Sequence, residues 1–250
     1  MTWEETVVFQ SERTAAYEEA LGELIRAGAA YPCTCTRKDV ATAATAPHRD
    51  DGITPYPGTC RGRFASADDA TRTTGRAAAW RVKTDAAPIE VRDEFAATAR
   101  FHLADVCGDF VIFKNDGVAA YQLAVTVDDA ASGVNEIVRG DDLLDSAARQ
   151  IHLRRLLGLA SQVRYWHVPL VVGKDGRRLA KRHGDTRVGF YRDRGVRQQR
   201  VLGLLGYWSG LLEGRCEATM DELADHFEID RIPTETVVFT EADHEFLLGR

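Results

Sequence analysis

The chain has 250 residues, 44% of them hydrophobic and 28% charged, with a formal net charge of −6, which is ordinary for a soluble globular protein of one large or two small domains. No apolar run reaches the roughly 18 residues of a membrane span, and the start shows no apolar core of a signal peptide, so we expect a cytoplasmic protein without a membrane partner. The negative charge argues against a general nucleic-acid coat, although a local basic face could still hold RNA.

The chain begins with a predicted helix and an irregular segment. Residues 10–27 carry apolar side chains at helical spacing, with Ser11 as the expected N-cap and Gly28 as the residue after the last turn. Residues 31–63 contain prolines and glycines and have no periodic pattern. That length is too great for a bare loop in a compact domain unless something holds it together. We therefore expect a stapled insertion at about residues 31–63.

Three of the five cysteines, Cys33, Cys35 and Cys60, lie in this insertion. In a cytosolic protein such a cluster is more often metal-binding than disulfide-bonded. Structural zinc takes four ligands, usually Cys or His. Composition points to His48 as the fourth ligand, with the phenolate of Tyr56 as the alternative. The competing interpretation is three free thiols in an irregular loop.

The stretch from residue 108 to residue 142 carries the densest pattern. After two short predicted strands at residues 77–83 and 88–93, residues 109–114 and 118–127 form two further apolar strand-like runs around an Asn-Asp-Gly turn. Residues 136–138 form another. Runs that are apolar on both faces are typical of the buried centre of a sheet. Ligands bind at strand ends in open α/β sheets, which predicts a site at the polar residues of these runs, namely Tyr121, Gln122, Asp128, Asp129 and Arg139.

Two of these side chains have alternative interpretations. The guanidinium of Arg139 is suited to bidentate binding of a carboxylate, but it could equally form an internal ion pair with a neighbouring aspartate. Tyr121 lies within an apolar run, where a core aromatic with a locally bonded hydroxyl is the commoner case.

The second half of the chain changes from mixed to helical pattern. A helix at residues 146–157 and a strand at residues 165–172 lead into a basic, glycine-bearing loop at residues 173–184. Its lysines and arginines suit neutralisation of phosphate charge during a reaction, the alternative being a solvated basic turn. Only helices are expected afterwards, at residues 188–194, 196–212, 219–227 and 241–248. This order predicts an α/β domain at residues 1–184 and a small helical domain at residues 185–250.

Several motifs resemble one known family. The segments Tyr121-Gln122-Leu123-Ala124-Val125, Asp128-Asp129 and Val138-Arg139-Gly140-Asp141-Asp142 resemble class I glutamyl-tRNA synthetase catalytic cores, and Arg178-Leu179-Ala180-Lys181-Arg182 is similar to their KMSKS-type loop. The resemblance is greatest to the glutamyl-queuosine tRNA(Asp) synthetases, short paralogues without an anticodon-binding domain. Their Cys-x-Cys and Tyr-x-x-x-Cys zinc pattern fits Cys33, Cys35, Tyr56 and Cys60. The resemblance thus implies Tyr56, rather than His48, as the fourth ligand.

The resemblance implies a Rossmann-type core with one zinc ion, and a specific reaction. ATP, with Mg, would activate glutamate to an adenylate without tRNA, and the glutamyl group would pass to queuosine at the wobble position of tRNA(Asp). By position, Tyr121 and Arg139 would hold glutamate, while Lys181 would stabilise the ATP phosphates as pyrophosphate leaves. The helical region from residue 185 would meet the anticodon stem-loop. A monomer is expected.

The chain departs from the family pattern at its start. The family's first strand and HIGH-type motif precede a segment like Gln10-Ser11-Glu12-Arg13, and no His-x-Gly-His or His-x-Gly-Asn occurs in this chain. We therefore expect an incomplete core that lacks part of the ATP site and a central strand, which would expose a sheet edge. The alternatives are a catalytically impaired or inactive truncated paralogue and a fragment of a glutamyl-tRNA synthetase. Upstream DNA would show whether the start codon is misassigned.

Overall fold

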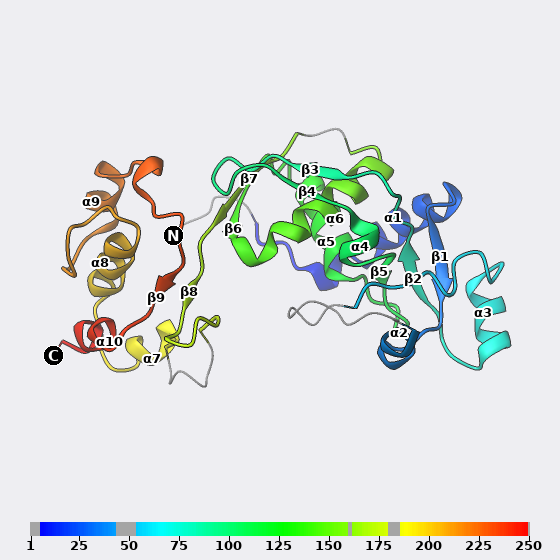
Figure 1. Ribbon diagram of the computed structural model, residues 1–250, viewed down its shortest axis with the longest axis horizontal. Coiled ribbons are helices and arrows are strands. Elements are labelled where there is room, and N and C mark those ends of the chain that lie inside the picture. The colour runs from blue at the N-terminus through cyan, green and yellow to red at the C-terminus, as the bar shows by residue number, and fades with distance from the viewer. Residues whose placement is uncertain (1–5, 44–53, 160–161, 180–185, 250) are drawn as a thin grey trace. The chain divides into compact units, whose positions relative to one another are not determined.

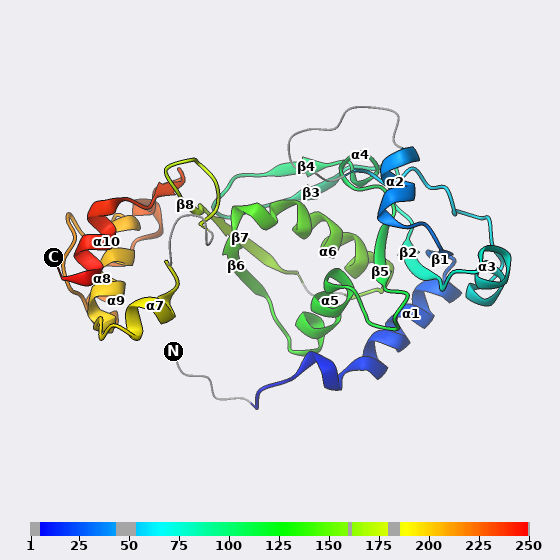
Figure 2. The same cartoon turned by 90° about the horizontal axis from the view of Figure 1, so that it is seen from below.

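The computed structural model describes residues 6–43, 54–159, 162–179 and 186–249. The chain divides into two compact units (Figures 1 and 2). The larger unit contains Met1–Val138 and Leu143–Trp166, and the C-terminal unit contains Arg139–Asp142 and His167–Arg250. The domain boundary expected between residues 184 and 185 lies outside the described residues and stays a prediction.

The larger unit mixes short strands with helices. Its helices are a 3-10 turn Gln10–Glu12, α1 Thr14–Arg26, α2 Arg37–Ala43, α3 Ala67–Thr74, α4 Leu103–Val106, α5 Tyr121–Ala131 and α6 Leu144–Leu156. Its strands are β1 Ala30–Cys33, β2 Ala79–Val82, β3 Ile89–Val91, β4 Ala99–Phe101 and β5 Phe110–Phe113, and two strands, β6 Glu136–Gly140 and β7 Arg164–Val168, begin in this unit and end in the other.

A three-stranded antiparallel sheet in the order β1-β2-β5 organises the larger unit. Apolar side chains of the sheet, such as Val82 and Ile112, lie in one buried core with Leu24 of α1, Leu123 of α5 and Leu153 of α6. The run at residues 109–114 is a strand, as predicted. This strand, β5, lies at the end of the order β1-β2-β5 and pairs with β2 in antiparallel orientation. The prediction that it lies at the centre of a sheet is therefore wrong for this sheet.

Three other predicted strands of this unit are present: residues 77–83 contain β2 of the same sheet, and residues 88–93 and 136–138 contain β3 and β6 of two-stranded sheets. Strands β3 and β4 form an antiparallel hairpin, and β6 forms a two-stranded sheet with β7. The predicted first helix is also present, but Ser11 lies inside the 3-10 turn and is not its N-cap. Arg13 precedes α1 and makes no side-chain capping bond. Gly28 follows the helix with φ +66°, a conformation that glycine adopts without strain.

One predicted strand is wrong. Residues 118–127 are not extended; Tyr121 begins helix α5, which runs to Ala131. The buried residues of this helix include Leu123 and Thr126, and the Thr126 hydroxyl donates to the carbonyl of Gln122 one turn earlier at 2.7 Å. A short apolar run fits a buried helix as well as a buried strand, so periodicity could not separate the two.

The insertion is more regular than expected. Its first residues end strand β1, and residues 37–43 form α2. Residues 44–53, which include His48, lie outside the described residues. The remaining part, residues 54–63, contains turns and leads to α3, after which the chain enters β2.

The C-terminal unit is mainly helical. It contains β8 Val171–Val172, α7 Val188–Arg192, α8 Gln198–Trp208, α9 Met220–Asp225, a 3-10 turn Ile229–Arg231, β9 Val237–Val238 and α10 Glu241–Leu248. The prediction of helices alone after residue 184 is wrong, because β9 pairs in parallel with β8. Tyr191, Leu204 and Leu247 form the buried centre of this unit. The start of α9 and the start of α10 each carry a capping box, which satisfies their first backbone N–H groups.

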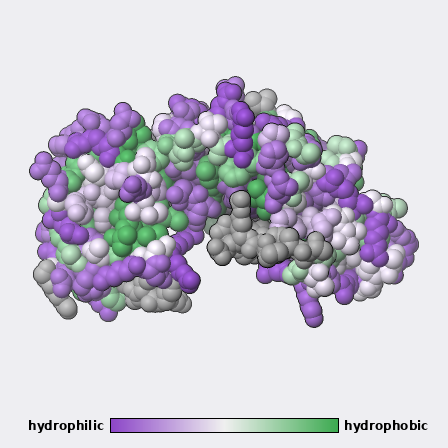
Figure 3. Space-filling model, viewed as in Figure 1, coloured by the Kyte–Doolittle hydropathy of each residue, from purple (hydrophilic) through white to green (hydrophobic). Residues whose placement is uncertain are grey.

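The face seen in Figure 3 is mainly hydrophilic, with smaller hydrophobic areas on both units. Among the described residues, no helix is both long and apolar enough to cross a bilayer.

Candidate functional site

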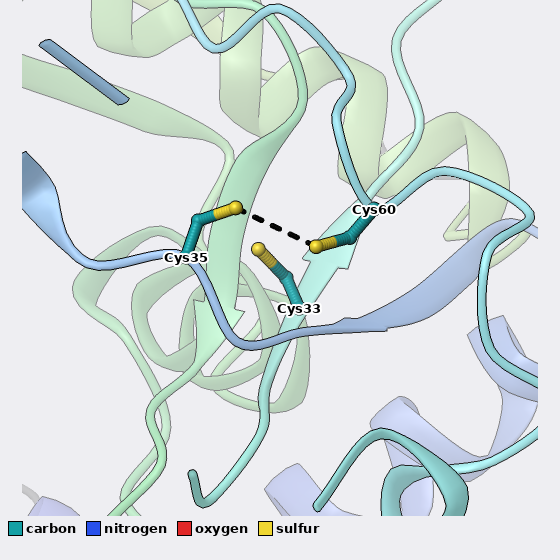
Figure 4. Close-up of side chains that lie close together, drawn as sticks. All are labelled: Cys33, Cys35 and Cys60. Carbon is teal, nitrogen blue, oxygen red and sulfur yellow. Dashed lines mark hydrogen bonds between the residues drawn. The ribbon is translucent and has the colours of Figure 1, made fainter. Parts of the chain in front are cut away.

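The three cysteines of the insertion meet in the larger unit. Cys33 ends β1, Cys35 follows two residues later, and Cys60 comes from the turn that closes the insertion (Figure 4). Their Sγ atoms all lie within 4.8 Å of one another. Cys33 and Cys60 are 2% and 1% exposed. Three thiols this close together, two of them buried, form a set of side chains that could hold a metal ion.

Tyr56 completes the group. Its hydroxyl lies 3.4 Å from Cys33 Sγ and 3.6 Å from Cys35 Sγ, and it accepts the backbone N–H of Cys60 at 2.8 Å. Three sulfur atoms and one phenolic oxygen thus converge, which is the number of donors that a tetrahedral metal ion requires. All four residues that the resemblance implied as ligands are therefore together, and the residues present fit a bound zinc ion.

The acidities of these groups are unequal. Burial raises the pKa of the Cys35 thiol to about 12, and it raises the pKa of the Tyr56 hydroxyl well above its ordinary value. Burial also acts to raise the pKa of Cys60, but hydrogen bonds, first from Tyr56 and then from the backbone of Thr34, outweigh burial and lower it. A metal ion would bind these side chains by displacing the protons that they carry.

A buried aspartate anchors this cluster to the sheet. Asp109 is 2% exposed and accepts from Tyr31 at 2.5 Å, from the Thr84 backbone at 2.8 Å and from both Nε and Nη2 of Arg61. Burial would raise the pKa of Asp109, but these bonds, beginning with those from Arg61, lower it below its ordinary value. Because Arg61 directly follows Cys60, the ion pair fixes the closing turn of the insertion against the strands.

The backbone of Tyr56 rests against Gly108. Tyr56 N donates to the carbonyl of Cys107 at 2.9 Å, and Tyr56 forms a parallel β-bridge with Gly108. A Cβ atom at position 108 would lie 2.2 Å from the Tyr56 carbonyl oxygen, and φ at Gly108 is +64°. Both facts require glycine at this position.

Tyr121, a candidate residue for glutamate binding, and its neighbour Gln122 differ in exposure. Tyr121 begins α5 and is 54% exposed, so it is not the core aromatic of the alternative interpretation. The adjacent Gln122 is buried; it donates to Ser146 at 3.1 Å and accepts from Gln150 at 3.1 Å. The start of α5 therefore has one outward aromatic side chain beside a buried polar network.

Asp128 has a different role from the one predicted for it. It lies on α5 rather than at a strand end, and it accepts from Gln10 at 2.9 Å, Arg13 at 2.5 Å and Tyr17 at 2.6 Å. Burial acts to raise the pKa of Asp128, but these hydrogen bonds lower it overall. Its carboxylate thus holds the first helical segment of the chain to α5.

Arg139 lies on β6 in the part of that strand that belongs to the C-terminal unit. Its Nε donates to Nε2 of His167 at 3.0 Å, and His167 is 1% exposed. Because a guanidinium only donates, Nε2 of His167 is the acceptor of this bond. The bond orients the guanidinium of Arg139.

The basic loop is described only in part. Gly173 N donates to the carbonyl of Arg177, Val172 forms a β-bridge with Arg178, and Arg178 forms an ion pair with Asp142 at 2.9 Å. Leu179 is half-buried. Ala180, Lys181 and Arg182, the remaining residues of the KMSKS-like segment, lie outside the described residues.

Residues with a clear part in the cluster were missed in the sequence. Arg81, Asp109 and Gly108 contact or support the four candidate ligands. Their roles depend on strand pairing between segments far apart in the chain. The available signal was charge in mainly apolar runs, with Arg81 in residues 77–83 and Asp109 at the start of residues 109–114.

Comparisons with the sequences of known proteins all identify the same family. The family model described as "tRNA synthetases class I (E and Q), catalytic domain" matches residues 1–243. A protein of Nocardia farcinica named Glutamyl-Q tRNA(Asp) synthetase is 43% identical over 96% of this chain and 74% of its own length. One of Geobacter sulfurreducens with the same name is 46% identical over 76% of this chain and 58% of its own length.

The fold is also found in solved structures. A glutamate tRNA ligase from Elizabethkingia meningosepticum, solved in complex with its amino acid, superposes with a TM-score of 0.76 at 18% identity. That match covers 98% of this chain and 54% of the ligase, so the chain spans about half the length of the solved enzyme. At this identity the match shows a shared α/β fold. The family model and the relatives show that the chain belongs to the class I tRNA synthetases (E and Q), among the glutamyl-Q tRNA(Asp) synthetases.

Proposed function

We propose that this chain carries out the reaction for which its relatives are named, the ATP-dependent activation of glutamate and its transfer to queuosine at the wobble position of tRNA(Asp). The observation that carries the proposal is 43% identity across 96% of the chain to a protein named Glutamyl-Q tRNA(Asp) synthetase. The convergence of Cys33, Cys35, Tyr56 and Cys60 supports it, because these four residues have the spacing of that family's zinc pattern and lie together in the fold.

In the first step, a carboxylate oxygen of glutamate attacks the α-phosphorus of ATP. The bond between that phosphorus and the bridging oxygen to the β-phosphate breaks, and pyrophosphate leaves. Catalysis of such a step consists mainly of positioning and charge stabilisation. Lys181, with Arg178 and Arg182 in the same basic loop, would neutralise charge on the phosphates together with Mg.

Two side chains would hold glutamate. The guanidinium of Arg139, oriented by its bond to His167, offers paired N–H donors to a carboxylate. The exposed hydroxyl of Tyr121 offers a further hydrogen bond at the start of α5. Each role is inferred from position in the family motif and from the exposure or orientation of that side chain within its own unit.

The proposed metal is one zinc ion held by Cys33, Cys35, Tyr56 and Cys60. A bound ion would supply structural cross-linking of the insertion rather than chemistry on the substrate. The helical C-terminal unit would contact the anticodon stem-loop of the tRNA, and the chain would act as a cytoplasmic monomer.

Glutamate-dependent exchange between ATP and labelled pyrophosphate, without tRNA, tests the first step. We expect exchange with glutamate and none with glutamine, and loss of exchange in Lys181→Ala. Absence of exchange in the unaltered 250-residue chain would contradict an activating function.

Transfer of labelled glutamate to tRNA tests the second step. We expect labelling of queuosine-containing tRNA(Asp) and none of the same tRNA made without queuosine. Labelling of tRNA(Glu) instead would assign the chain to ordinary glutamyl-tRNA synthesis.

A further inference from the structure

Arg81 lies where the sheet meets the cysteine cluster. It is on β2, opposite Tyr31 of β1 and Val111 of β5, directly after a shift in register between Trp80 and Arg81. Its Nε donates to Cys33 Sγ at 3.3 Å, and its Cζ lies 3.8 Å from the centre of the Tyr56 ring. One guanidinium therefore contacts two of the four candidate metal ligands.

A third contact fixes this guanidinium. Its Nη1 donates to the backbone carbonyl of Asp109 at 2.6 Å. The Asp109 side chain forms an ion pair with the neighbouring Arg61, so the charge of Arg61 is already matched. The guanidinium of Arg81, by contrast, contacts a sulfur atom, an aromatic ring and a backbone carbonyl.

We propose that Arg81 is a positioning residue for the metal centre, which offsets the negative charge of the ligands and fixes the sulfur of Cys33. A divalent ion with three thiolates carries a net negative charge, and a phenolate would add another. Cys33 and Cys60 are almost fully buried, and burying net charge is costly unless an opposite charge is close. The guanidinium supplies that charge at hydrogen-bond distance from one ligand. This inference rests on the proposed metal site.

Arginine can make all three of these contacts at position 81, and lysine cannot. The planar guanidinium donates from two edges while its face covers the Tyr56 ring, and an ammonium group is a single point charge that cannot make all three contacts together. Lysine would retain the charge but lose the orientation of Cys33. The two contributions can thus be separated by substitution.

The test compares Arg81→Met, Arg81→Lys and the control Arg100→Met with the unaltered chain. Arg100 is an exposed arginine of the β3–β4 hairpin, where it pairs with Glu90. Zinc affinity is measured by competition with a chromogenic chelator, and the number of bound thiolates by the sulfur-to-cobalt charge-transfer absorption of the Co²⁺-substituted protein. We expect Arg81→Met to lose roughly 10- to 100-fold in affinity, with the charge-transfer intensity of three thiolates kept, and Arg81→Lys to lose less.

Affinity within about twofold of the unaltered chain in both Arg81 variants would overturn the inference, as would an equal loss in Arg100→Met. If Arg81→Met does not fold, as judged by circular dichroism, Arg81→Lys decides by the same twofold limit. A chain that binds no zinc would remove the metal proposal and this inference with it, whereas tight zinc unaffected by Arg81 would remove this inference alone.

Discussion

The cysteine cluster and the start of helix α5 are both candidate sites in the larger unit, and they are built in opposite ways. In the cluster, Cys33, Tyr56 and Cys60 are at most 5% exposed and are bonded to one another or to neighbours. At the start of α5, Tyr121 is 54% exposed. Buried polar groups that bond to one another contribute to the free energy of unfolding, so their loss should destabilise the fold. An exposed side chain can be replaced with little effect on stability. Substitutions should therefore separate the two regions.

Cys60→Ser should have the largest effect. It removes one thiolate from the four-ligand group, so we expect bound zinc to fall from one ion per chain to near zero, with a loss of stability of about 4 kcal/mol, equivalent to roughly 10 °C in Tm. Metal analysis and thermal unfolding measure the two effects. Cys216→Ser, which changes the exposed cysteine of the C-terminal unit, is the control. Unchanged zinc in Cys60→Ser would remove the cluster as a metal site.

Asp109→Asn should come next, with a loss of about 2–3 kcal/mol, because the carboxylate accepts charge-assisted bonds from Arg61. The folded-state pKa of Asp109 is lowered, so its contribution is present above the pKa of the unfolded chain and is lost as the pH falls through the folded value. Urea unfolding between pH 7 and pH 3 should show less acid sensitivity in the variant. Asp105→Asn, at an exposed site on α4, is the control. Equal acid sensitivity in the Asp109 variant would argue against this role.

Gln122→Leu should cost about 2 kcal/mol, because it removes a donor to Ser146 and an acceptor from Gln150 inside the core. Chemical denaturation measures the change. Gln198→Leu, at the exposed start of α8, should stay within about 0.5 kcal/mol of the unaltered chain. A neutral Gln122→Leu would mean that the buried network at α5 does not contribute to stability, and the contrast with Tyr121 would disappear.

Tyr121→Phe should have the smallest effect on stability, below about 0.5 kcal/mol, since the hydroxyl is on an exposed side chain. In the pyrophosphate exchange assay, its apparent affinity for glutamate should fall about threefold to tenfold, as expected for one lost hydrogen bond. Tyr207→Phe, on α8, serves as the control. Unchanged glutamate affinity would exclude the hydroxyl of Tyr121 from the site, and a large loss of stability would mean that the two regions do not differ as described.

The sequence predicted the members of the cysteine cluster better than the residues that hold the cluster in place. Cys33, Cys35 and Cys60 follow from residue type and local spacing, whereas composition alone favoured His48 over Tyr56, and only the resemblance to the family implied Tyr56. Asp109, which supports the cluster, acts through partners 25 to 78 residues away, and such contacts depend on strand pairing that no local pattern encodes. The strand at residues 136–138 was predicted correctly from its short apolar run. Helix α5 was not, because its residues were predicted to form a strand. An apolar run of ten residues suits either a buried strand or a buried helix.

Gly108 lies outside the cysteine motif, yet the position of Tyr56 depends on it. A methyl group there would lie 2.2 Å from the carbonyl oxygen of Tyr56 and would displace the bridge that holds Tyr56 beside the three sulfur atoms. A relative could therefore keep every cysteine and still lose the Tyr56 oxygen from the proposed metal site through one mutation outside the motif. Glycine at this position is thus a marker to read alongside the cysteines when homologous genes are sorted into metal-binding and metal-free groups.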